Sequence, residues 1–271
     1  METGQQFLMP KNSSIINSKL SFHIFNDGFF LNSNSEKNYF LYEDINLSDQ
    51  KELVKFLKFN EIGNHSEPKI IFFDSPSMFI PSKLHDYKNS KEFLSNYTGL
   101  KPNYRVAFDI TQDEEICVTY QLNKKIEKSL NECFKKTEHK HYSTILYDHL
   151  KEYIKSDTDG KLKLFVNLQK NKFDLLLIEN QNLIVYNSFP HSSTDDFMYY
   201  LFALIEEYKL SVNSFDILFL AKLEVFKNYY SSVTNFHDKI KFVENDSTQN
   251  TNNDHPSPYF RVRSIACGAL P

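Results

Sequence analysis

Short apolar runs separated by polar turns dominate residues 20–42, and this pattern predicts three β-strands in a meander. The turn between the first two runs is Asn26-Asp27-Gly28, and an Asx-Gly pair between apolar runs is typical of a β-hairpin. From Leu53 onward the apolar residues recur with a helical period, and Ser48 is expected to cap this helix. The structured part of the chain therefore begins with a meander followed by a helix.

The rest of the first half alternates between strand and helix patterns. The predicted elements are a strand at 69–74, a helical stretch opened by Pro81 that ends near Gly99, strands at 104–110 and 115–120, and helices at 126–134 and 144–154. A cluster of turn residues at 157–160 closes this half.

After that cluster the same order of elements begins again. The predicted elements are strands at 162–168, 173–178 and 183–186, a helix opened by Asp195, a strand at 215–220, a helix at 223–232 and a strand at 239–243. Each half thus contains a βββαβαβ unit, which predicts a mixed sheet with helices on both faces. Two such units in tandem are the layout of the ribonuclease-H-like, actin-like fold. We therefore expect an α/β protein formed by tandem duplication.

This repeat sets the expected domain boundaries. We predict a disordered tail at 1–18, a first ribonuclease-H-like subdomain at 19–142 and a second at 161–271, joined by a helix and turn at 143–160. A polar, Asn-rich loop is expected at 244–258.

Composition narrows the classes of function. Only three of the 31 basic residues are Arg and the net charge is −4, so we expect no direct nucleic-acid binding. Cys117, Cys133 and Cys267 are odd in number and widely spaced, which fits neither a disulfide framework nor a zinc site. The first 18 residues are polar and no apolar stretch reaches bilayer length. We therefore expect a soluble, cytoplasmic protein without a membrane span.

One segment of the second half is distinctive. Residues 183–189 read Leu-Ile-Val-Tyr-Asn-Ser-Phe, and residues 195–201 read Asp-Asp-Phe-Met-Tyr-Tyr-Leu. This aromatic strand, its Asn-Ser-Phe end and the acidic pair before Phe-x-Tyr-Tyr resemble an uncharacterised Bacteroidetes family, domain-of-unknown-function family 3822. The hairpin at 26–29 and the His255-Pro256 segment are also similar to it. The resemblance implies an actin-like ATPase fold and no known activity.

An actin-like fold raises the question of a nucleotide site. Such sites use two hairpins whose acidic and glycine residues approach the phosphates. The first hairpin offers Asp27 and Gly28, whereas the second has no glycine and carries Asn167 where an acidic residue is expected, with Asp174 nearby. Asp27, Gly28 and Asp174 are thus the candidate nucleotide-binding residues. We expect no tight binding of ATP with Mg²⁺ and no other cofactor.

No other group of residues forms a recognisable catalytic or metal site. His139, His141 and His149 have no Cys or carboxylate at ligand spacing beside them. Cys267 is expected to be a free thiol rather than a nucleophile, and Ser188 is not in a nucleophile-elbow motif. The sequence leaves the question of an enzyme open and favours a negative answer.

A second kind of site is an interaction surface at the start of the helix opened by Asp195. Asn187 and Ser188 are expected to end a strand. Asp195 and Asp196 are expected to stabilise the helix N-terminus, because their negative charges interact favourably with the helix dipole. Tyr199 follows the apolar stripe out of phase and is expected to face solvent. The two alternatives for Tyr199 are a partner surface and packing under a loop.

The leading hypothesis from the sequence is a non-catalytic, actin-like scaffold or adaptor that binds another protein. Two alternatives stay open: a weak or vestigial nucleotide-binding ATPase, and an accessory protein in ribosomal RNA modification. A glycine-rich phosphate loop would favour the first alternative, and a basic, aromatic face would favour the second.

Overall fold

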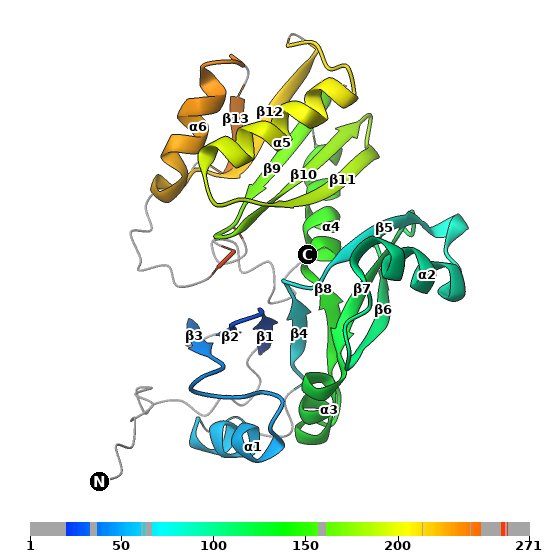
Figure 1. Ribbon diagram of the computed structural model, residues 1–271, viewed down its shortest axis with the longest axis vertical. Helices are drawn as coiled ribbons and strands as arrows, with labels where there is room; N and C mark the ends of the chain where they lie inside the picture. Colours follow the sequence, from blue (N-terminus) through cyan, green and yellow to red (C-terminus); the bar gives the residue numbers. More distant parts are fainter. Residues whose placement is uncertain are drawn as a thin grey trace. The chain divides into compact units, whose positions relative to one another are not determined.

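Two five-stranded sheets with the same strand order organise the molecule (Figure 1). The structure is a computed structural model that describes residues 20–32, 37–60, 62, 67–156, 161–212, 214–238, 240–244, 256, 257 and 259. The chain divides into unit 1 (Met1–Asp148 with Ala266–Pro271) and unit 2 (His149–Ile265). This division falls within one helix, α4 (Tyr142–Lys155).

The sheet of unit 1 has the order β3-β2-β1-β4-β8. Its strands are β1 (Ser21–Ile24), β2 (Gly28–Asn32), β3 (Lys37–Leu41), β4 (Lys69–Phe72) and β8 (Glu138–His141). The first three strands form the predicted antiparallel meander, and β4 lies parallel to both β1 and β8.

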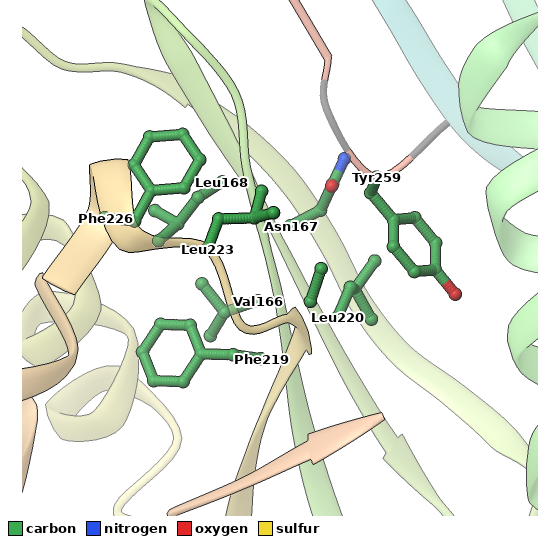
Figure 2. A pocket seen from close by; sticks show the side chains of 9 residues that line it. Val166, Asn167, Leu168, Phe219, Leu220, Leu223, Phe226 and Tyr259 are labelled. Atoms are coloured by element: carbon green, nitrogen blue, oxygen red, sulfur yellow. The ribbon is translucent and has the colours of Figure 1, made fainter. Parts of the chain in front are cut away.

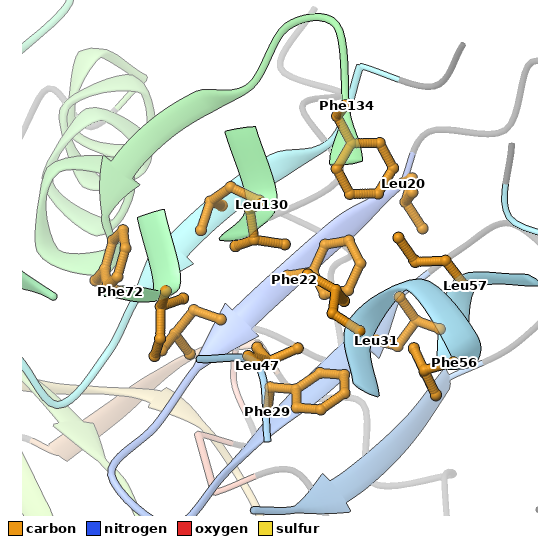
Figure 3. Packing of buried hydrophobic residues seen from close by; sticks show 14 of the residues in the cluster. Leu20, Phe22, Phe29, Leu31, Leu47, Phe56, Leu57, Phe72, Leu130 and Phe134 are labelled. Atoms are coloured by element: carbon orange, nitrogen blue, oxygen red, sulfur yellow. The ribbon is translucent and has the colours of Figure 1, made fainter. Parts of the chain in front are cut away.

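One face of this sheet is covered by α1 (Gln50–Phe59) and α3 (Lys124–Cys133). Figure 3 shows Phe22 and Phe29 of the sheet packed against Phe56 of α1 and Leu130 of α3. On the other face, Tyr142 from the start of α4 stacks on Phe73, with ring centroids 5.0 Å apart. Helices therefore cover both faces, as the repeat predicts.

The cap of α1 differs from the prediction by one residue. Asp49, and not Ser48, is the N-cap, and its carboxylate accepts hydrogen bonds from the backbone N–H groups of Lys51 and Glu52. Both residue types can cap a helix, so the choice depends on where the preceding loop delivers the chain.

The sheet of unit 2 has the order β11-β10-β9-β12-β13, which repeats the order in unit 1. Its strands are β9 (Leu162–Leu168), β10 (Lys172–Glu179), β11 (Asn182–Pro190), β12 (Phe215–Ala221) and β13 (Ile240–Glu244). The helical elements on one face are α5 (Thr194–Glu207), the short η2 (Glu224–Phe226) and α6 (Lys227–Thr234). Tyr153 of α4 contacts Phe165 on the opposite face, so this sheet is also covered on both sides.

Unit 1 contains an insertion between β4 and α3 that the simple repeat did not predict. Its elements are β5 (Ser77–Pro81), the short η1 (Ser82–Leu84), α2 (Tyr87–Thr98), β6 (Tyr104–Ile110) and β7 (Ile116–Asn123). The three strands form a separate antiparallel sheet in the order β5-β7-β6. Pro81 is the N-cap of η1 and Gly99 is the C-cap of α2, so the helical stretch begins and ends where the sequence predicts. Pro81 also ends β5, a strand that was not predicted because its pairing partner β7 is distant in sequence.

A buried carboxyl group joins the inserted sheet to the central sheet of unit 1. Asp109 of β6 accepts hydrogen bonds from the Tyr120 hydroxyl at 3.1 Å, the His141 backbone N–H at 2.7 Å and the Thr144 hydroxyl at 2.9 Å. Burial raises the pKa of Asp109 to about 6, against the lowering effect of these three donors. The junction between the inserted sheet and the central sheet therefore contains a buried group whose charge depends on pH.

Some sequence expectations fall on parts of the chain outside the described residues. These are the disordered tail at 1–18, most of the loop at 244–258, His255 and Cys267. Within the part that the structure describes, no helix has both the length and the apolar composition needed to cross a membrane.

Candidate functional site

The turn between β1 and β2 carries the first pair of nucleotide candidates, Asp27 and Gly28. The Asp27 carboxylate accepts a hydrogen bond from the Tyr39 hydroxyl, with 2.5 Å between the oxygens. A Cβ at Gly28 would collide with the carbonyl oxygen of Phe40 on β3. The close approach of β3 therefore explains this glycine without a phosphate.

The second hairpin places the fully buried Asp174 in a hydrogen-bond network. Its carboxyl oxygens accept from the Asn167 amide at 2.8 Å, the Gln169 amide at 2.9 Å and the Tyr186 hydroxyl at 3.3 Å. Asp174 and Asn167 are 0% exposed and Gln169 is 2% exposed. The Asp174 carboxyl group therefore holds three side chains of unit 2 in place through hydrogen bonds.

A small cavity lies beside Asn167 (Figure 2). Its volume is about 10 Å³, which is room for about one water molecule. The buried Asn167 side-chain oxygen has no hydrogen-bond partner among the described residues, so such a water would satisfy it. The cavity is far too small for a nucleotide base or a phosphate chain.

Two of the three histidines considered above, His139 and His141, have partners within unit 1. In unit 1, the His141 ring nitrogens lie 2.6 Å from the Ser143 hydroxyl and 2.9 Å from the Ser75 carbonyl oxygen. His139 contacts Thr137 and Glu127, and burial lowers its pKa despite that carboxylate. Among the described residues, no group of three His, Cys, Asp or Glu side chains is arranged to hold a metal ion.

The strand before α5 is longer than the sequence predicts. β11 continues to Pro190, so Asn187 and Ser188 lie within the strand and pair with Leu175 and Asp174 of β10. Adjacent strand residues point to opposite faces. The two polar residues therefore cannot act on one surface, and only Asn187 shares a face with the α5 side of the sheet.

The acidic pair at the start of α5 has two different placements. Asp196 forms a capping box with Ser193, and its carboxylate also accepts from the Ser192 backbone N–H at 2.9 Å and hydroxyl at 2.7 Å. These Ser192 hydrogen bonds hold the pKa of Asp196 below its usual range. Asp195 is exposed beside this cap. The Asp196 carboxylate thus caps the helix, whereas Asp195 faces solvent.

Tyr199 is 69% exposed and belongs to a longer stripe along α5. Helical residues at i, i+4, i+7 and i+11 share one face, and here they are Asp195, Tyr199, Phe202 and Glu206. We call this set the α5 stripe. All four side chains are exposed, and its two aromatic residues lie between two acidic ones.

Phe202 and Glu206 are the members of this surface that the sequence analysis missed. Phe202 contacts Phe236 just after α6, with ring centroids 5.2 Å apart, and Phe236 is 60% exposed. The periodicity of the exposed residues, counted from Asp195, could have found both.

Comparisons with known proteins agree with this architecture. A protein from Bacteroides thetaiotaomicron VPI-5482, described as having an actin-like ATPase fold and unknown function, aligns over 83% of this chain and 90% of its own, with 18% identity and a TM-score of 0.68. A chain of the PilM–PilN type IV pilus biogenesis complex aligns over 92% of this chain and 97% of its own, with 9% identity and a TM-score of 0.51. At such identities the likeness shows the fold alone.

No curated protein matches the chain. The family model described as protein of unknown function (DUF3822) matches residues 11–240, most of the sequence. The tandem α/β architecture expected from the repeat is confirmed. The chain belongs to the DUF3822 family and has the actin-like ATPase fold.

Proposed function

We propose that this protein is a non-catalytic adaptor that binds another protein through the α5 stripe. The observation that carries the proposal is the exposure of Tyr199 and Phe202 next to Phe236 on one surface of unit 2. Exposed aromatic side chains that are gathered on one surface favour protein–protein contact, because burying them on association removes apolar area from water.

The charge of the surface indicates the chemistry of the partner. The α5 helix contains Asp195, Asp196, Glu206 and Glu207 and no Lys or Arg. A partner with an apolar centre and a basic rim would complement it, and its approach would be accelerated by electrostatic attraction. The spacing along the α5 stripe fits recognition of a helix face by a groove.

Two further observations concern the partner: one supports a protein partner, and the other supports a cytoplasmic location. The PilM neighbour is described in a complex with PilN, so a protein of this fold can work through a protein partner. Cys117 and Cys133 are free thiols, as expected in a reducing compartment such as the cytoplasm. The proposed partner is therefore a cytoplasmic protein or a cytoplasmic segment of one.

Direct binding of RNA receives less support. Arg105, the one arginine in the part of the chain that the structure describes, forms a two-point ion pair with Glu127. Its Nε donates to Glu127 Oε2 at 2.8 Å. The guanidinium fork that would recognise a phosphate is therefore used inside unit 1.

We predict that Tyr199→Ala leaves the melting temperature nearly unchanged and weakens partner binding at least tenfold. The side chain is 69% exposed, so its removal costs little packing, whereas an interface would lose an aromatic anchor. A photo-crosslinking amino acid at position 199 would capture the partner in the native cell, and the same amino acid in place of the similarly exposed Val225 is the control. The captured protein would then be titrated against wild type and variant.

A second test asks whether the partner is basic, as the acidic α5 helix predicts. Asp195→Lys should weaken binding of the captured protein, and raising the salt concentration should weaken binding to the wild type. A captured protein that binds Tyr199→Ala and Asp195→Lys as tightly as wild type would rule out the α5 stripe as its docking surface. A loss of stability of more than about 1 kcal/mol in Tyr199→Ala would point instead to a packing role.

For nucleotides, we predict that millimolar ATP with Mg²⁺ does not shift the melting temperature. A ligand at 100 times its Kd stabilises the folded state by about 2.7 kcal/mol, so a micromolar site would give a clear shift. Asp27 and Asp174 already have partners within the fold, which supports this expectation. A shift of several degrees that disappears in Asp27→Ala would establish a nucleotide site and contradict the proposal.

A further inference from the structure

Unit 1 contains a cavity of about 250 Å³ where the chain leaves β1 and β4. Phe25 and Asn26 line it from the end of β1, and Asp74 lines it from the end of β4. Tyr42 approaches from the loop after β3, while Lys101 and Tyr104 belong to the insertion. The cavity thus has aromatic walls, one carboxylate and an amine at its edge.

Its position is one at which open α/β sheets bind ligands. β1 and β4 are parallel neighbours, and the sheet is extended by β2 and β3 on one side and by β8 on the other. The strand order therefore reverses between β1 and β4. In such sheets the crevice at the carboxyl ends of the strands on either side of the reversal is a preferred binding place.

The electrostatic environment of the cavity favours a positive ligand. Burial raises the pKa of Tyr42 well above its usual range, and Tyr104, Asp27 and Asp74 raise it further. Two carboxylates thus contribute a negative potential at the Tyr42 hydroxyl. This potential opposes phosphate groups and attracts cations.

The protein already places one cation against this aromatic wall. The Lys101 amine lies 5.6 Å from the centroid of the Tyr104 ring, within the range of a cation–π interaction. The Lys101 side chain is exposed, so a ligand can displace it at small cost. The contact shows that the Tyr104 face accepts a positive group.

From these features we propose that the cavity binds an organic cation, namely the guanidinium or ammonium group of an arginine or lysine side chain. Asp74 accepts a hydrogen bond from the Asn26 N–H at 3.0 Å, and it would also accept from the cation, since the two oxygens of a carboxylate offer about four acceptor positions. Tyr42 and Tyr104 would provide aromatic faces.

The Tyr42 hydroxyl supplies an independent reason to expect a ligand. Its oxygen is buried and has no hydrogen-bond partner among the described residues. Buried polar groups are normally paired, and a bound guanidinium group would provide the missing donor.

Calorimetric titration with N-acetyl-arginine amide tests the proposal. The matched neutral probe is N-acetyl-citrulline amide, which has nearly the same shape without the charge. We expect saturable binding of the arginine compound and at least tenfold weaker binding of the citrulline compound. Equal binding of both compounds, no binding at 10 mM, or displacement by Mg²⁺ alone would overturn the proposal.

Three variants locate the binding in this cavity. Asp74→Asn should weaken arginine binding at least tenfold, and Tyr42→Phe should weaken it several-fold without loss of stability, because the hydroxyl has no partner among the described residues. Lys101→Gln should tighten binding, because it removes the competing amine, whereas the exposed Lys91→Gln serves as the unchanged control. Unaltered affinity in Tyr42→Phe and Lys101→Gln would exclude this cavity as the site.

A further titration, with free arginine, identifies the source of the cation. Binding of the blocked arginine compound as tight as that of free arginine would indicate a side chain of a polypeptide. Much tighter binding of free arginine would indicate a free amino acid, since only that compound carries the α-amino and α-carboxyl groups. Either result is compatible with a cation site, and neither depends on the α5 stripe of unit 2.

Discussion

Asp174→Ala is expected to lower the free energy of unfolding by about 3 kcal/mol. The substitution removes the acceptor of the Asn167 and Gln169 amides and of the Tyr186 hydroxyl. Asn167 and Gln169 are almost completely buried, so water cannot replace the lost acceptor without opening the fold. Buried donors without a partner retain their full desolvation cost.

Urea denaturation of wild type and variant measures this difference, and hydrogen exchange in β9 and β10 localises it. Asp195→Ala is the matched control, because the exposed Asp195 should contribute only a few tenths of a kcal/mol through the helix dipole. If Asp174→Ala proved as stable as wild type, the network would have no structural role. A nucleotide-binding role for Asp174 would then regain support.

Asp109→Asn is expected to abolish a loss of about 3 kcal/mol in the free energy of unfolding that the wild type shows as the pH rises. Burial raises the pKa of Asp109 from 3.8 to about 6, so between these values the folded state binds more protons than the unfolded state. Wild-type stability therefore falls as the pH rises from about 4 to about 6, and the loss is complete above that range. The difference between the two pKa values, at about 1.4 kcal/mol per pH unit, gives the expected size.

The measurement compares the free energies of unfolding of wild type and Asp109→Asn at pH 3.5, below the unfolded-state pKa of 3.8, and at pH 7.5. The variant should gain stability relative to wild type as the pH rises, because asparagine does not titrate. Lys140 and Asp148 also act on this region, and the pKa of Asp148 is raised to about 6 by burial. Both remain in the two proteins, so most of their effect cancels. Parallel pH profiles would show that Asp109 keeps an ordinary pKa.

The sequence predicted the part of the fold that depends on local order. The meander around Asn26-Asp27-Gly28 and the restart of the pattern after residue 160 led to the tandem α/β fold. Strand and helix periods and turn chemistry are properties of neighbouring residues, so they can be read without a partner. The insertion was predicted only in part: its strands β6 and β7 were expected, but β5 was not, because β5 depends on pairing with the distant β7.

The candidate sites show the same division. The exposure of Tyr199 followed from the helical period of its neighbours, and Phe202 and Glu206 could have been found in the same way. The partners of Asp174 and the cavity lined by Tyr42, Asp74 and Lys101 could not, because the residues involved come from separate elements.

The sequence by itself thus determined the repeated unit, the expected family and the solvent-facing side of α5. Only the tertiary structure decided which polar groups are used inside the protein and which surround a space that a ligand can enter. The physical reason is that burial, hydrogen-bond partnership and electrostatic potential depend on groups brought together from distant positions. Asp27 and Asp195 are both acidic residues at turns or helix starts, yet only the fold gives one a tyrosine partner and places the other beside exposed aromatic residues.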